Sequence, residues 1–184
     1  MSLNLFSELA AENNITFSGG INLARVRYKK IANRVNISFR SGFNIAIETK
    51  AGPEIIGLNF LQRGGNIAIK ETDEKLTYTF NYITGYALHP VQLNKKLILL
   101  GGINFGQCIR GSNTLTSNNI TYKNKIEAKF FMFDIGLQLG ANIMFNNQFG
   151  IRAIYYFGIT DVAMNISSDY NFKNQGLGIT FLIK

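Results

Sequence analysis

Five charged side chains fall at positions where strand alternation would place them on the same face as glycine, serine, threonine and asparagine. They are Arg40, Glu48, Arg63, Asp134 and Arg152. Buried charges persist in proteins only when they are paired and hydrogen-bonded. The sequence therefore predicts an interior network in which Glu48 and Asp134 neutralise arginines of other strands. Such a network could line a polar path or a binding site, or it could fill the interior of a small closed barrel, which we favour.

Residues suited to catalysis or metal binding are few. The single histidine, His89, precedes Pro90 in a predicted turn without an evident serine partner, whereas a hydrolase needs a nucleophile, a base and an orienting acid within reach of one another. Cys108 is the only cysteine, which excludes an intramolecular disulfide and a metal site built on thiolates. We therefore expect no catalytic residues, no metal ligands and no cofactor.

The stretch that must position Asp134 is Lys129 to Met144, KFFMFDIGLQLGANIM. Its apolar side chains alternate with small or polar ones, and a β-strand sends successive side chains to opposite faces. Strands of globular proteins usually run about 5–6 residues, whereas a tilted strand needs about 9–11 residues to cross a bilayer. The alternation in Lys129–Met144 runs for more residues than either of these two strand lengths, which indicates a membrane-spanning strand.

Seven further segments show the same two-residue alternation. They are Ile15–Leu23, Asn36–Glu48, Ile55–Gly65, Leu76–Leu88, Leu97–Ile109, Phe149–Thr160 and Asn174–Lys184. The connections between the eight segments alternate between longer and short, the longest being Arg110–Ala128. Outer-membrane barrels combine an even strand count with short periplasmic turns and longer extracellular loops. The predicted fold is therefore all-β, an eight-stranded antiparallel up-and-down transmembrane β-barrel with a polar interior filled by side chains.

The size of the side chains decides which face of each strand lies inside. Eight strands enclose an interior that side chains just fill, so the face of small and polar residues should be inside. A soluble eight-stranded barrel would need the reverse, and a large apolar exterior would make a soluble monomer aggregate. We therefore predict a set of aromatic side chains that face lipid: Phe39, Phe43, Phe60, Tyr82, Phe105, Phe131, Phe133, Tyr155, Phe157 and Phe181.

The charge of the chain is +8 at pH 7, with a pI near 9.6. Lysine and arginine are scattered among predicted loops instead of forming one stripe, and no nucleic-acid-binding motif is present, so we expect no nucleic-acid partner. A basic rim could meet anionic lipid head groups or the phosphates of lipopolysaccharide. Simple solubility of the loops is the competing explanation.

The 184 residues predict one domain at 15–184, preceded by a flexible N-terminal segment at 1–14. Residues 1–14 have neither the basic start nor the apolar core of a signal peptide. Because an outer-membrane protein requires a signal, we expect the sequence to be that of a mature chain in the bacterial outer membrane.

Short glycine-based motifs resemble those of a known family. They are Gly57-Leu58-Asn59-Phe60 with Gln62-Arg63-Gly64, Tyr82-Ile83, Gly101 to Gly106, Asp134-Ile135-Gly136-Leu137 with Gly140, Arg152 with Tyr155, Tyr156 and Gly158-Ile159, and Lys173-Asn174. From Ile15 to Lys184 the chain resembles the outer-membrane β-barrel domain common in Bacteroidetes, the PorT-like barrels, which are related in architecture to OmpA and OmpX. The resemblance implies the fold and carries no role to any single residue, although some members of that family take part in protein secretion.

We expect a non-enzymatic outer-membrane protein with a structural or interaction role, such as a subunit of an envelope assembly or secretion system. Its recognition elements would be the loops Arg25–Arg34 and Arg110–Ala128, because loops on a rigid scaffold carry recognition. Its partners would be lipopolysaccharide and other outer-membrane lipid, and an envelope protein bound through extracellular loops or periplasmic turns. A lipid-modifying enzyme and a narrow pore for small solutes are the alternatives.

Overall fold

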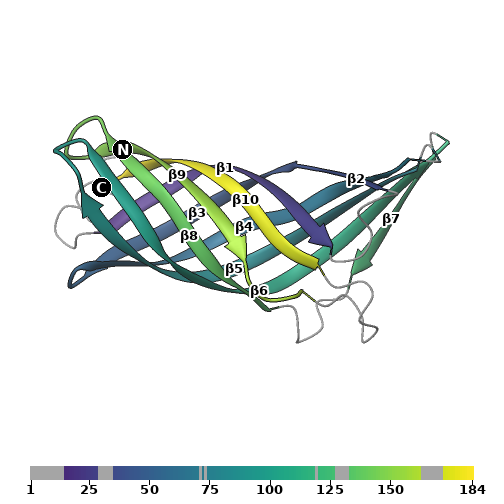
Figure 1. Cartoon of the computed structure of the whole chain (residues 1–184), viewed down its shortest axis with the longest axis horizontal. Coiled ribbons are helices and arrows are strands. Elements are labelled where there is room, and N and C mark those ends of the chain that lie inside the picture. Colours follow the sequence, from purple (N-terminus) through teal and green to yellow (C-terminus); the bar gives the residue numbers. More distant parts are fainter. Residues whose placement is uncertain are drawn as a thin grey trace, which may run out of the picture.

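The structure, a computed structural model, describes residues 15–28, 35–70, 72, 74–118, 120–126, 133–162 and 172–184. The regular structure of these residues is entirely β (Figure 1). Its strands are β1 (Ile15–Tyr28), β2 (Val35–Ser38), β3 (Arg40–Ala51), β4 (Glu54–Ile69), β5 (Lys75–Gln92), β6 (Leu97–Ser117), β7 (Ile120–Ile126), β8 (Phe133–Met144), β9 (Phe149–Gly158) and β10 (Phe172–Ile183).

Eight of these strands close a ring. The hydrogen-bonded order is β4, β3, β1, β10, β9, β8, β6 and β5, and the pairing of β5 with β4 completes the circle. Each of these ladders is antiparallel. A closed ring leaves no sheet edge facing lipid, which is why barrels can span membranes. The predicted eight-stranded antiparallel barrel is confirmed.

One end of the barrel carries the tight turns and the other carries the long extensions. The turns at 52–53, 93–96 and 145–148 lie at the same end as the C-terminus, on the left in Figure 1. In two of them an asparagine, Asn94 or Asn146, accepts hydrogen bonds from two backbone N–H groups that follow it. Because outer-membrane barrels have short periplasmic turns, we take this end as periplasmic.

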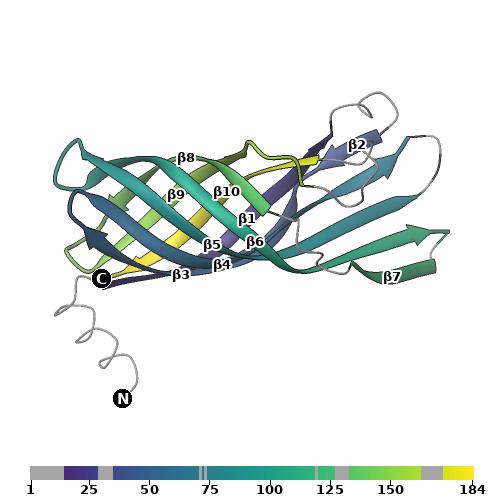
Figure 2. The same cartoon turned by 90° about the horizontal axis from the view of Figure 1, so that it is seen from below.

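At the extracellular end the strands run further than predicted. The predicted connection Arg110–Ala128 is largely strand, and β4 continues to Ile69 within the predicted connection Asn66–Lys75. These strands arise because β4, β5 and β6 continue past the ring and β7 folds back on β6 (Figure 2). The predicted strand Asn36–Glu48 is divided at Phe39 into β2 and β3, and β2 pairs with β4. No helix in the described part of the chain is long and apolar enough to cross a membrane.

The outer wall of the barrel is apolar. Exposed side chains include Ile45, Leu58, Ile103 and Leu139, each at least 59% exposed. Seven of the aromatic residues predicted to face lipid are also exposed on this wall: Phe39, Phe43, Phe105, Phe133, Tyr155, Phe157 and Phe181. Phe60 is partly buried and its ring contacts that of Phe43, whereas Phe131 lies outside the described residues.

The prediction that Tyr82 faces lipid is wrong. Tyr82 is fully buried inside the barrel, and so are Phe80 and Leu88 on the same face of β5. The large side chains fit because inner positions of the neighbouring strands are glycines: a Cβ at Gly57 would lie 2.5 Å from the Tyr86 ring. The rule that small residues face inward therefore fails on β5, where bulky inner residues face glycines on β4 and β6.

Candidate functional site

The polar interior of the barrel holds two separate groups of charged residues. The first, which we call the periplasmic network, joins β3 to β9. Arg152 donates to both carboxylate oxygens of Glu48, at 2.5 and 2.8 Å. Its Nε donates to Asn142 Oδ1 at 2.8 Å, and the hydroxyl of Tyr86 donates to Glu48 Oε2 at 2.7 Å. Side chains from β3, β5, β8 and β9 are thereby tied together.

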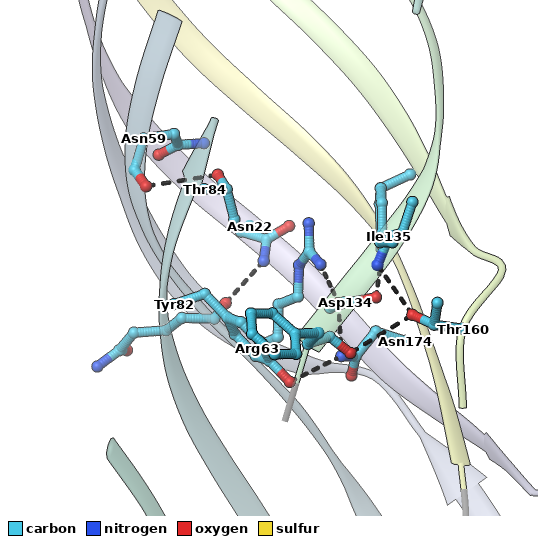
Figure 3. A network of polar contacts seen from close by, with 12 residues as sticks. Asn22, Asn59, Arg63, Tyr82, Thr84, Asp134, Ile135, Thr160 and Asn174 are labelled. Carbon is cyan, nitrogen blue, oxygen red and sulfur yellow. Dashed lines mark hydrogen bonds and ion pairs between the residues drawn. The ribbon is translucent and has the colours of Figure 1, made fainter. Parts of the chain in front are cut away.

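The second group, the extracellular network, is centred on Asp134 of β8, which is completely buried (Figure 3). Its carboxylate forms an ion pair with Arg63 of β4 and accepts a hydrogen bond of 2.5 Å from the Tyr156 hydroxyl. Asn174 of β10 donates to the same carboxylate at 2.7 Å and to the Tyr82 hydroxyl at 3.1 Å. Side chains of β4, β9 and β10 thus meet at the Asp134 carboxylate of β8, and Asn174 links them to Tyr82 of β5.

Aromatic rings cover the Arg63 guanidinium. Its central carbon lies 3.7 Å from the centre of the Tyr156 ring and 5.4 Å from that of Tyr82. A cation over the face of an aromatic ring is attracted by the ring quadrupole, more strongly when both are desolvated. The two rings therefore help to hold the Arg63 guanidinium in place and cover part of its surface.

An apolar cluster lies inside the barrel beside the extracellular network. Its buried members are Val26, Leu61, Ile67, Tyr78, Phe80, Tyr82, Cys108, Val162 and Phe172. The Phe80 ring packs against those of Tyr78 and Phe172, with centres 5.9 and 5.4 Å apart. This cluster fills the interior toward the extracellular end, and Cys108 is one of its small packed residues.

A cavity of about 60 Å³ separates the two networks, and residues of both line it, including Arg63, Tyr156, Tyr86 and Arg152. It has room for roughly four water molecules. Four lining oxygens have no hydrogen-bond partner among the described residues: those of the side chains of Asn44, Asn59, Gln138 and Thr180. A buried polar cavity with unpaired oxygens is the kind of site that water fills.

A second cavity, of about 360 Å³, lies at the periplasmic mouth of the barrel. Glu48 and Asn142 form part of its wall, so the periplasmic network borders this opening. Lys50 and Lys184 also line it. Partial burial lowers the pKa of Lys184, and the nearby charge of Lys50 lowers it further.

Of the five charges predicted to form one network, the structure brings four together as two separate pairs and leaves out Arg40. Arg40 has the inward register of β3, opposite Ala24, and is half-buried. Among the described residues it has no acidic partner. Sequence reasoning missed four uncharged side chains that hydrogen-bond to these charges: Tyr86, Asn142, Tyr156 and Asn174. Asn142 and Tyr156 share the alternation of Asp134 and Arg152 along their strands, and that register was the signal that could have found them.

The single histidine lies outside these networks. His89 Nδ1 is 2.9 Å from Glu54 Oε1, and both side chains are exposed near the periplasmic turns. Among the described residues no hydroxyl or thiol is hydrogen-bonded to His89. No group of three or more histidine, cysteine, aspartate or glutamate residues that could hold a metal is present in the described part of the chain either.

Comparison with family models matches residues 10–163 to the outer membrane protein beta-barrel domain. The chain belongs to this family. The match covers most of the chain and agrees with the closed ring and the apolar outer wall. The protein is therefore an outer-membrane β-barrel protein, and the bacterial outer membrane is its location, as the sequence predicted. The narrower attribution to the PorT-like barrels of Bacteroidetes stays a prediction.

Two solved structures illustrate the likeness of fold. Neisserial surface protein A superposes with a TM-score of 0.58 at 10% identity, over 92% of this chain and 96% of that one. Ail, the attachment invasion locus protein of Yersinia pestis, gives 0.51 at 15% identity, over 92% and 97%. At these identities the likeness concerns the fold alone. Comparison with curated proteins finds no match.

Proposed function

We propose that this outer-membrane barrel is non-enzymatic and acts through interaction, with its extracellular sheet as the recognition element. The observation that carries the proposal is the continuation of β4, β5 and β6 beyond the apolar wall. On the outer face of β5, for example, Ile83 is followed toward the extracellular end by Asn81, Thr79 and Thr77. The sheet therefore leaves the lipid and enters water.

The β6–β7 hairpin is the most accessible part of this sheet. β7 pairs with β6 from Gly111↔Ile126 to Ser117↔Ile120, and its side chains are almost all exposed. Ile120 and Tyr122 are 55% and 57% exposed although they lie outside the apolar wall. Exposed aromatic and aliphatic residues on a rigid extension are typical of surfaces that bind partners.

The filled interior argues against a solute pore. The two ion-pair networks and the apolar cluster occupy the space that eight strands enclose, and the intervening cavity has room for only a few waters. A lipid-modifying enzyme would need a base next to a nucleophile, and His89 contacts Glu54 instead. Neither alternative has an observation in its favour.

The proposal can be tested by placing a photo-crosslinking amino acid at Tyr122 in cells that produce the protein. The matched control carries the same amino acid at Lys95, an exposed turn residue at the periplasmic end. We expect a discrete adduct to a surface or envelope protein from position 122. Adducts from position 95 alone would contradict an extracellular recognition role, and measurable conductance of the purified barrel in planar bilayers would favour the pore.

A further inference from the structure

Two arginines interrupt the outer wall at its extracellular margin. On the outer face of β1, Ile21 and Leu23 are followed by Arg25 and Arg27. On the paired strand β10, Leu177 is followed in the same direction by Gln175 and Lys173, which lie opposite the two arginines. The change from apolar to cationic residues on both strands marks the level at which the hydrocarbon ends.

Neighbouring aromatic residues hold both guanidinium groups against the wall. The Arg25 guanidinium carbon lies 5.0 Å from the centre of the Phe39 ring, and that of Arg27 lies 4.7 Å from the centre of the Phe157 ring. With its side-chain oxygen turned toward β1, Gln175 also accepts hydrogen bonds from Arg25. The two arginines therefore have defined positions, unlike long side chains that extend freely into water.

Within the described part of the chain, the two arginines of this patch carry charges that are not neutralised. Arg25 and Arg27 have no acidic partner among the described residues. Lys173 lies 3.8 Å from Asp161, which neutralises that lysine in part. Stacking uses the face of a guanidinium and leaves N–H groups at its edge. Arg25 donates to Gln175 through Nε and one Nη, so its remaining N–H groups and those of Arg27 are the ones that can donate to a phosphate.

We propose that Arg25 and Arg27 form a binding site for a phosphate group of the outer-leaflet glycolipid, lipopolysaccharide. Phe39, Phe157 and the adjoining apolar wall would contact the acyl chains of the same molecule while the arginines hold its phosphate. The site depends on the outer-membrane location of the barrel and not on the extracellular recognition role, so either can fail without the other.

The test uses the refolded full chain in nanodiscs of phosphatidylcholine that contain a small fraction of lipid A, with native mass spectrometry to count retained lipid A. A hydrogen bond to a charged group contributes about 1.5–3 kcal/mol, and 1.4 kcal/mol is a tenfold change in affinity. We therefore expect the R25Q/R27Q variant to retain lipid A at least about tenfold more weakly. Phosphate-free lipid A should bind the unaltered protein as weakly as the variant binds lipid A.

The matched control is K95Q/K96Q, which removes two positive charges from the exposed periplasmic turn and should leave lipid A retention unchanged. If the double arginine variant does not refold, R27Q alone gives the same comparison, because Arg25 keeps its contacts to Phe39 and Gln175. Equal retention by the arginine variant and the unaltered protein would overturn the proposal. Equal retention of phosphorylated and phosphate-free lipid A would also overturn it.

Discussion

The two interior networks have the same chemistry in different surroundings. Both pair one carboxylate with one arginine and add a tyrosine hydroxyl and an asparagine. The periplasmic network borders the mouth cavity of about 360 Å³, whereas aromatic rings and an apolar cluster enclose the extracellular network. The barrel is therefore closed by packing toward the cell exterior and open to water toward the periplasm.

This difference determines the energetic consequence of losing one partner. A charge that loses its partner beside the mouth cavity of about 360 Å³ can be solvated, but one that reaches only the cavity of about 60 Å³ keeps more of its desolvation penalty. The same substitution should therefore cost more free energy of unfolding in the extracellular network than in the periplasmic one.

The largest effect is expected from Asp134→Ala. The change leaves the Arg63 guanidinium without its anion in a buried site, and breaking a buried pair in this way costs about 3–5 kcal/mol. Thermal unfolding in detergent micelles, followed by circular dichroism, measures the loss. An unchanged melting temperature would contradict the assigned role of Asp134.

Glu48→Gln should have a smaller effect. Arg152 keeps Asn142 as a partner, and Glu48 and Asn142 line the mouth cavity, so we expect a loss of about 1–3 kcal/mol. The same unfolding measurement should be made beside Asp134→Asn, which changes the charge at constant size. A greater loss from Glu48→Gln than from Asp134→Asn would reverse the comparison.

Alanine substitution of one glycine beside each network compares the two networks by steric crowding. Gly136 lies beside the extracellular network and Gly57 beside the periplasmic network. A Cβ at Gly136 would meet the Phe157 carbonyl oxygen at 2.4 Å, whereas at Gly57 the nearest atoms belong to the end of the Tyr86 side chain. Overpacking costs about 1–3 kcal/mol, so we expect Gly136→Ala near the upper end and Gly57→Ala near the lower. Gly85→Ala, whose Cβ would have no atom within 4 Å, is the neutral control.

The smallest effect is expected from Tyr82→Phe. It removes the hydroxyl that accepts the 3.1 Å hydrogen bond from Asn174, while Asn174 keeps its bond to Asp134. The expected loss is about 0.5–1.5 kcal/mol. Tyr82→Arg would instead bury an unpaired charge, and a stable, fully folded Tyr82→Arg barrel would show that the ring does not lie inside.

Much of this architecture could be predicted from residue periodicity. The alternation around Asp134 and Arg152 gave the correct inner register, because strand geometry alone sends every second side chain inward. The pairing of the charges could not be predicted in the same way. Which arginine reaches Glu48 depends on how β3 and β9 are placed in the barrel, and Glu48 and Arg152 are 104 residues apart in the sequence. The side-chain partners Tyr86 and Asn174 depend on the placement of their strands too.

The error on β5 has a different physical origin. Periodicity separates two faces but does not say which is inside, and the size rule used to decide it holds for the barrel as a whole and not strand by strand. On β6, Gly106 leaves room for the inner side chains of β5, because a Cβ there would lie 2.5 Å from Thr84 Cγ2 and would also touch the Tyr82 ring. Such complementarity between neighbouring strands becomes visible only once the strands are paired.

The extent of the extracellular sheet was also missed. Nine of the 19 residues of Arg110–Ala128 are serine, threonine or asparagine, which favour loops in the sequence. The structure pairs Thr114 with Lys123 and Thr116 with Thr121, so a polar hairpin continues the barrel wall in water. Alternation between apolar and polar residues cannot mark strands whose two faces are both polar.

A double-mutant cycle between the two networks tests the central claim most directly. Arg152 and Tyr156, one from each network, are four residues apart on β9, roughly 13 Å along the strand. At such separations free-energy losses usually add within about 0.5 kcal/mol. We predict that the losses of Glu48→Gln and Asp134→Asn, measured by unfolding in micelles, will add within that range in the double variant. A deviation of more than about 1 kcal/mol would show one coupled network and contradict the account.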